Sequence, residues 1–278
     1  MKNTFFSLLF ILFAATLFVG CDSDVMDDET TMTSLRIQPV FDGQQLVAGQ
    51  TYDHNGTAIN FGTARIYLSE IVLIKEDGTE VSFQGDTFAV PAKNEANEDV
   101  TLTVNDRVIL AKHDLGHDQW ELGEAESGQY KGIRFKVGID GANNRIDASQ
   151  VPSDNPLAKQ TDKNNHWSWA NGYIYLRMDG QVDSDGNGTP DTPWETHIGK
   201  TTFLKTVQLD MDFELDTDNN LIHVMVDYHK FLNLVDLSDP GQRLCHTGDN
   251  LPVAQKVGGM IAGAFEFHGL HLTEEHAQ

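Results

Sequence analysis

Cysteine is scarce in this 278-residue chain, which has two, Cys21 and Cys245. Cys21 follows an apolar segment at the start of the chain, which leaves Cys245 without a second cysteine for an internal disulfide. A lone thiol in an oxidising compartment is buried, reactive or a metal ligand. The adjacent His246 keeps a metal-binding role open for Cys245, beside the commoner role of a buried free cysteine.

Basic residues are also few, with 19 Lys and Arg against 42 Asp and Glu and a formal net charge of −23. Nucleic-acid binding needs clustered Lys and Arg to neutralise phosphates, so this balance excludes nucleic acid as a partner. The sequence also lacks a phosphate-binding glycine loop and the motifs G-x-S-x-G, H-E-x-x-H and C-x-x-C-H. These absences predict a binding protein rather than an enzyme.

Long apolar runs are missing apart from residues 5–19, near the N-terminus. This run is short for a membrane-spanning helix and ends at Gly20-Cys21, a pattern typical of a lipoprotein signal peptide. We therefore expect residues 1–20 to be removed and Cys21 to carry the lipid; the alternative is an uncleaved membrane anchor. The protein would be exported and lipid-anchored, on the periplasmic side or the cell surface of a bacterial outer membrane.

The rest of the chain has no linker rich in Pro, Gly or Ser, so residues 35–278 are expected to form a single domain after a flexible acidic tether at 21–34. Residues 207–215 alternate between apolar and polar, as in a strand with one wet face, and residues 260–267 resemble a closing strand. Helical periodicity is confined to short pieces such as residues 228–234. The sequence predicts a mainly β fold, a two-sheet antiparallel β-sandwich with long loops.

Residues 166–199 are the most distinctive part of the chain. Here His-Trp-Ser-Trp precedes the strand Gly-Tyr-Ile-Tyr-Leu-Arg-Met-Asp-Gly, and His-Ile-Gly follows an acidic loop. Upstream, Tyr-Asp-His-Asn-Gly (52–56) precedes Ile-Tyr-Leu-Ser (66–69), and Gly-Gln-Tyr (128–130) leads into Ile-Arg-Phe-Lys-Val-Gly-Ile-Asp (133–140). In this order the motifs resemble those of the MbnP family of periplasmic copper-binding proteins, to which the methanotroph copper proteins MopE and CorA are related. The resemblance covers roughly residues 35–235.

The resemblance implies copper capture or handling outside the cytoplasm. It places His197 among the ligands and implies that Trp167 or Trp169 is oxidised to kynurenine, whose aryl amine can ligate copper where an indole cannot. A MauG-like di-haem peroxidase is the implied partner for this oxidation. His166 is expected as the second ligand because it adjoins the tryptophans, with His54 in reserve. In the alternative interpretation both tryptophans pack in the core and His197 hydrogen-bonds to a backbone carbonyl.

The acidic loop before His197 has the spacing of a calcium-binding loop. Its alternating oxygen-bearing side chains are those of Asp183, Asp185, Asn187, Thr189 and Asp191. Gly188 permits the tight bend, but Trp194 stands where such loops carry their final bidentate Glu. We predict a structural Ca²⁺ at this loop; the alternative is a plain solvated Asp-Gly turn.

The remaining histidines give weaker signals. His113 and His117 have a metal-ligand spacing if their segment is helical, but Gly116 between them favours a loop. His223 and His229 flank a strand end and are expected to serve packing and solvation. The C-terminal histidines are expected to have weak metal affinity at most; they are His268, His271 and His276.

A second function remains compatible with the sequence, that of a calcium-stabilised surface lipoprotein which binds a glycan or a protein partner. Tryptophans would then serve as stacking platforms. The candidates are Trp120, Trp167, Trp169 and Trp194.

Overall fold

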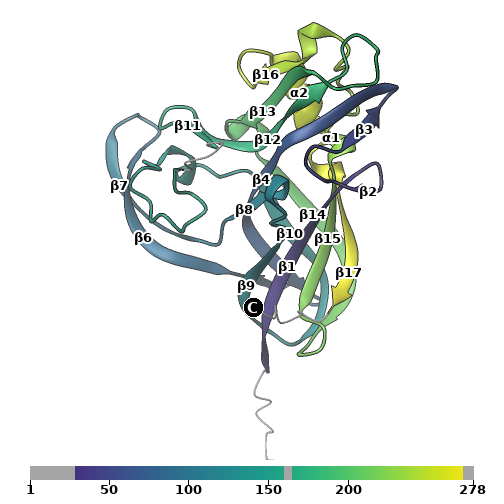
Figure 1. Ribbon diagram of the computed structural model, residues 1–278. Coiled ribbons are helices and arrows are strands. Elements are labelled where there is room, and N and C mark those ends of the chain that lie inside the picture. The colour runs from purple at the N-terminus through teal and green to yellow at the C-terminus, as the bar shows by residue number, and fades with distance from the viewer. Residues whose placement is uncertain (1–28, 160–164, 272–278) are drawn as a thin grey trace, which may run out of the picture.

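The computed structural model describes residues 29–159 and 165–271, which form a mainly β structure (Figure 1). The predicted signal peptide and the lipidation site Cys21 lie outside the described residues. The first strand begins at Thr30, so residues 30–34 of the expected tether belong to a sheet instead. The mainly β prediction is confirmed.

The larger sheet has ten strands. Its central path runs in the order β14 (Lys205–Leu215), β10 (Gly128–Val137), β4 (Thr57–Lys75), β12 (Gly172–Val182), β13 (Thr192–Gly199) and β16 (Leu244–His246). Three short strands pair with the long β4, namely β3 (Thr51–His54), β5 (Glu80–Ser82) and β8 (Ile109–Lys112), and β11 (His166–Ser168) pairs with β12. The distinctive segment 166–199 thus forms β11, β12 and β13 of this sheet, and the upstream motif at 66–69 lies in the neighbouring strand β4.

The second sheet has five strands. Its path is β17 (Phe265–His271), β15 (Leu221–Asp227), β1 (Thr30–Phe41) and β2 (Gln44–Gln45), and β9 (Gln119–Glu126) also pairs with β1. A separate two-stranded sheet consists of β6 (Gln84–Lys93) and β7 (Asp99–Asp106).

The strand pairs of the two large sheets are antiparallel, as predicted, except at two places. Strand β15 runs parallel to β1, and β16 runs parallel to β13. Parallel neighbours need a long crossover connection. Both pairs join segments that are distant in the sequence, so no tight hairpin dictates their direction, and local strand patterns give no sign of it.

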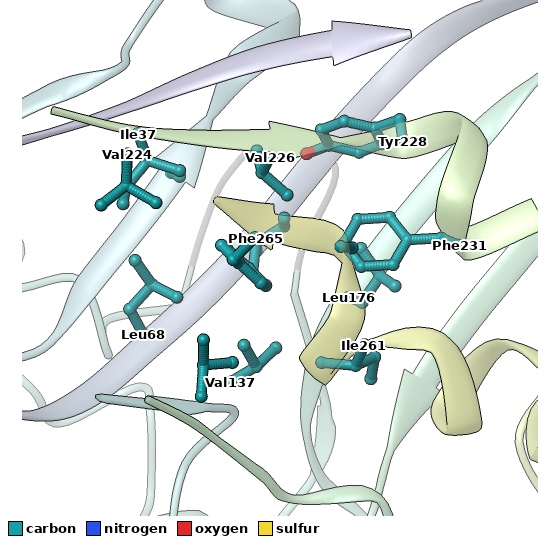
Figure 2. Packing of buried hydrophobic residues seen from close by; sticks show 14 of the residues in the cluster. Ile37, Leu68, Val137, Leu176, Val224, Val226, Tyr228, Phe231, Ile261 and Phe265 are labelled. Atoms are coloured by element: carbon teal, nitrogen blue, oxygen red, sulfur yellow. The ribbon is translucent and has the colours of Figure 1, made fainter. Parts of the chain in front are cut away.

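The two large sheets face each other across the main core. Figure 2 shows side chains from both sheets meeting there, with Val224 and Val226 of β15 on one side and Leu68 and Leu176 of the larger sheet on the other. Each of these four side chains is fully buried. Successive residues of a strand point to opposite faces, so the residue between Val224 and Val226 on β15 points away from this core.

Helices are few and short among the described residues. Helix α1 (Tyr228–Leu232) matches the predicted helical piece, whereas α2 (Leu251–Met260) was not predicted. Because α2 and a 3₁₀ turn at Ala262–Ala264 occupy the start of the expected closing strand, β17 begins at Phe265. The other 3₁₀ turns are His113–Leu115, Asn143–Arg145, Thr201–Phe203 and Pro240–Gln242. None of the helices in the described ranges has the length and apolar character needed to cross a membrane.

Candidate metal centre

Strand pairing at one edge of the larger sheet brings two histidines together. The parallel register of β13 and β16 sets His197 directly beside His246. Their rings stack with centroids 4.7 Å apart and planes inclined by 16°. His197 is buried and His246 is half-buried, so the pair lies at the boundary between protein and solvent.

A carboxylate completes this group. Glu195 precedes His197 by two residues on β13, so the two side chains lie on the same face of the sheet. A Glu195 Oε2 accepts a hydrogen bond from His246 Nε2 at 3.0 Å. One ligand atom from each of Glu195, His197 and His246 lies within 4.8 Å of the other two. Within the described ranges, no other set of three or more His, Cys, Asp and Glu side chains is this close.

His197 is held in place by a carboxylate on the neighbouring strand. Its Nε2 lies 2.5 Å from Asp179 Oδ1, and Arg177 Nε donates to Asp179 Oδ2 at 2.8 Å. Burial raises the pKa of Asp179, but its hydrogen bond with His197 and the charges of His197 and Arg177 outweigh burial, so the pKa lies below its ordinary value. Asp179 is therefore an anionic acceptor that fixes the orientation of the His197 ring.

Trp167 lies on the same face as His197, beyond Gly199. A side chain at Gly199 would collide with the Trp167 ring, because a Cβ there would lie 2.6 Å from Trp167 Cζ3. The glycine of the His-Ile-Gly motif thus makes room for the indole. Trp167, His246 and Asp249 line a common pocket of about 420 Å³. Its other lining residues are Ser168, Asn171, Lys200 and Gly248.

The second tryptophan of the motif has different partners. The Lys93 ammonium lies 5.9 Å from the centre of the Trp169 ring, and the Trp169 side chain hydrogen-bonds to Asp147. Trp169 is not among the residues that line the pocket beside His246. Of the two tryptophans that the sequence left open, Trp167 is the one that shares a pocket with His246.

The two other histidines predicted as ligands are not part of this group. His166 packs edge-on against Tyr173, a member of the smaller core cluster, with ring centroids 4.7 Å apart. His54 lies at the end of β3, where its Nε2 is 2.9 Å from the Val235 carbonyl oxygen. Adjacency in sequence was therefore a poor guide to ligand geometry.

A model of the MbnP family matches residues 30–247 of the chain. The chain belongs to the MbnP family. Its structure is similar to that of MbnP from Methylosinus trichosporium, with a TM-score of 0.52 and 17% sequence identity over 82% of this chain and 88% of that one. At this identity the likeness shows a shared fold. No curated protein sequence matches the chain.

The match to the MbnP family ends one residue after His246. The sequence draws attention to His246 as the neighbour of Cys245 and does not mark Glu195 as a metal ligand. One feature of the sequence could have identified Glu195 as a ligand: it precedes His197 by two residues, a spacing that puts both side chains on the same face of a strand. Cys245, in contrast, is fully buried in the main core of this MbnP family member, where burial raises the pKa of its thiol.

The acidic loop of this MbnP family member connects β12 to β13. Asp183 organises it, because its carboxylate accepts backbone N–H groups from Gly186, Asn187 and Gly188 at 2.7 to 3.1 Å. Asn187 Oδ1 accepts the Thr189 N–H at 2.7 Å, while the Asp191 side chain binds the Thr192 hydroxyl at 3.1 Å. The loop has the bend that the calcium prediction requires; the ion itself remains a prediction.

Trp194 occupies the position where a calcium loop would end in Glu. Its side chain is fully buried in the main core, and its indole N–H donates to the Gln181 carbonyl oxygen at 3.2 Å. Trp194 is therefore not a stacking platform for a glycan, which removes one of the four tryptophans on which that alternative depended. Trp120 is partly buried and packs against the main core.

Proposed function

We propose that this protein binds copper outside the cytoplasm, as a capture or handling protein rather than an enzyme. The observation that carries the proposal is the donor group formed by Glu195, His197 and His246. Membership of the MbnP family supports it, because the family is associated with copper and with the periplasm. The predicted signal peptide would direct export and be removed, and lipid on Cys21 would anchor the exported chain to a membrane.

The donor set suits the metal. Imidazole is a preferred ligand of copper, and among divalent first-row metals copper binds nitrogen and oxygen sites most tightly. When the Nε2–H of a neutral His197 ring donates its hydrogen bond to Asp179, the Nδ1 atom carries the lone pair that can bind a metal. Histidine ligands of metal sites commonly donate their second N–H to a carboxylate in this way. Glu195 would contribute an oxygen donor and negative charge.

Trp167 would supply a further nitrogen after oxidation. An indole N–H can only donate, whereas ring opening to kynurenine gives an aryl amine with a lone pair. Two equivalents of hydrogen peroxide would cleave the C2–C3 bond of the indole, each adding one oxygen atom to a ring carbon and releasing the other as water, to give N-formylkynurenine. Hydrolysis of the formyl group would then release the lost carbon as formate and free the aryl amine. A MauG-like di-haem peroxidase is the proposed partner that delivers the oxidising equivalents. Trp167 is partly exposed in its pocket, which gives an external oxidant a route to it.

The acidic loop at 183–191 would hold a structural Ca²⁺. It joins β12, which carries Asp179, to β13, which carries Glu195 and His197. An ion that fixed this connection would fix the relative positions of both strands at the copper end of the sheet. The calcium ion would thus support the copper site without belonging to it.

Copper titration of protein purified from its native host tests the proposal. One copper ion per chain should bind tightly to the unaltered protein, and His197→Ala or His246→Ala should weaken binding at least tenfold, since each removes a ligand. His117→Ala is the matched control because His117 is an exposed histidine outside the strands β13 and β16 that carry the proposed centre. If His117→Ala weakened copper binding as much as His246→Ala, copper would be bound by scattered surface histidines and the proposed centre would be wrong.

A further inference from the structure

A second histidine cluster lies on the smaller sheet. His223 is on β15, and His268 and His271 are on the neighbouring edge strand β17 (Figure 1). The His223 ring stands 4.9 Å from the His268 ring at 90° and 5.4 Å from the His271 ring, measured between centroids. The sheet that carries this cluster is distinct from the sheet that carries the candidate copper centre.

A β-bulge brings these three histidines together. The register of β15 and β17 shifts between His223 and Val224, so His268 and Gly269 together oppose His223. Without the bulge, alternation along β17 would put His268 on the face opposite to His271. Gly269 has a φ of +132° and no side chain, and His271 Nε2 lies 3.7 Å from where its Cβ would be. The positive φ favours glycine at this bulge, and His271 packs over it at an ordinary van der Waals distance.

The separation of the two facing nitrogen atoms fits a shared metal ion. His223 Nδ1 and His271 Nε2 lie 3.4 Å apart, which is long for a hydrogen bond. With zinc–nitrogen bonds of 2.0–2.1 Å, two ligands of a tetrahedral ion would be separated by about 3.3–3.4 Å. The two imidazoles are thus already spaced as one edge of a zinc tetrahedron.

The tautomer of His223 also fits. Its Nε2 lies 2.8 Å from Gln38 Oε1, and an amide oxygen can only accept, so Nε2 carries the proton and Nδ1 the lone pair. Gln38 on β1 thus orients His223 as the outer partners of metal-bound histidines do. The charges of Arg36 and Asp118 act on His223, and these two side chains pair with each other at 2.9 Å. Burial, followed by the Arg36 charge, lowers the pKa of His223 to about 4, so the ring is neutral at neutral pH.

We propose that His223, His271 and His268 form a second metal site, which binds a divalent ion of the zinc type through imidazole nitrogens. His223 and His271 supply the two nitrogen ligands that already have the required separation. His268 is exposed and completes the site by turning its ring toward the ion. Water fills the remaining position, as in other three-histidine zinc sites. The site does not depend on the proposed copper function.

Zinc titration of the full chain tests this site. The titration uses the His197→Ala/His246→Ala double variant, which removes the candidate copper centre, with excess calcium to occupy carboxylate sites. One zinc ion per chain should still bind. Adding His271→Ala should weaken that binding at least tenfold, and His268→Ala should weaken it less. Gln38→Ala should weaken it about tenfold, as loss of an outer partner does, while His117→Ala should change nothing.

Cobalt provides an independent readout, because tetrahedral Co²⁺ absorbs visible light far more strongly than hydrated Co²⁺. The double variant with Co²⁺ should show this band, and His271→Ala should abolish it. His271 and His268 are exposed, so these variants should fold even if a His223 variant does not. Failure of the double variant to bind zinc, or zinc binding that His271→Ala leaves unchanged, would overturn the proposal. Neither result would affect the copper test, which concerns residues on the other sheet.

Discussion

The rings of His197 and His246 lie face to face, 4.7 Å apart and nearly parallel, at the junction of β13 and β16. Strand β16 has just three residues, and its last residue is His246. The position of His246 therefore depends on a short parallel pairing. Thr247 secures it, because its hydroxyl donates to the His197 carbonyl oxygen at 2.8 Å and accepts the Gly199 N–H at 3.0 Å.

The modified residue should be Trp167 rather than Trp169, because Trp167 lines the pocket beside His246 whereas Trp169 packs near Lys93. Peptide mapping of protein from the native host should find one tryptophan that has lost a carbon and gained an oxygen, at position 167. Trp169→Phe should still be modified. Trp167→Phe should be unmodified and bind copper as weakly as recombinant protein made without the peroxidase. Modification at position 169 in the unaltered protein would contradict this assignment.

Asp179→Asn should weaken copper binding by about 10- to 100-fold, the usual effect of removing an outer-shell partner of a histidine ligand. The amide is nearly the same size as the carboxylate, but it is uncharged and holds the His197 ring less firmly. Copper affinity is measured by competition with a chelator of known strength. Asp210→Asn on β14 is the control, since Asp210 is exposed and contacts Gln208. Equal affinities for the two variants would show that Asp179 does not position the ligand.

Acid should destabilise the protein partly through His113. This histidine is buried beside Tyr228, with its Nδ1 2.8 Å from the hydroxyl, and burial lowers its pKa from 6.5 to about 4. Between these values the unfolded chain binds more protons than the folded one, so the free energy of unfolding falls as pH drops from 6.5 to 4. The contribution is on the order of 3 kcal/mol.

Urea unfolding at about pH 7 and about pH 4.5 measures this effect. The pKa shift of His113 sets both the pH range over which the free energy of unfolding falls and the amount by which it falls. His113→Gln should lose less stability between the two conditions than the unaltered protein does, although its stability at neutral pH will be lower. His117→Gln, at an exposed position, should retain the full loss. An identical loss in both variants would mean that His113 is not the titrating group.

Calcium should raise the melting temperature of metal-stripped protein, because a ligand that binds the native state alone stabilises it by mass action. Asp185→Ala should remove this increment while leaving Asp183 to organise the loop. Asp218→Ala is the control, since it lies in another acidic turn, which Asp216 organises. A melting temperature that did not respond to millimolar calcium would leave the loop as a plain turn.

The mature N-terminus should be an acylated Cys21. Intact-mass measurement of protein from the native host should show a chain that begins at Cys21 and carries lipid, because the apolar run and Gly20 direct cleavage to that residue. Cys21→Ser should abolish both lipidation and membrane association, whereas Cys245→Ser should not. A mass that began at Met1, or at a residue after Cys21, would contradict this.

Local periodicity determined much of the fold. The alternation along residues 207–215 and the short helical piece near Tyr228 are properties of a few consecutive residues, and both are present in the structure. The His-Ile-Gly motif likewise selected His197, and its glycine proves to make room for Trp167. The strand features follow from the chain because, in a regular strand, successive side chains point to opposite faces.

The tertiary structure decided which residues meet. His246 reaches His197 through the parallel pairing of β13 and β16, and His223 meets His268 and His271 through a bulge between β15 and β17. Such pairings depend on the register between segments far apart in the chain, and a shift of one residue would turn every side chain to the other face. His166 illustrates the converse, since it adjoins Trp167 in sequence and yet packs against Tyr173 outside the donor group. The sequence supplied the ligand types, and the sheet register supplied the site.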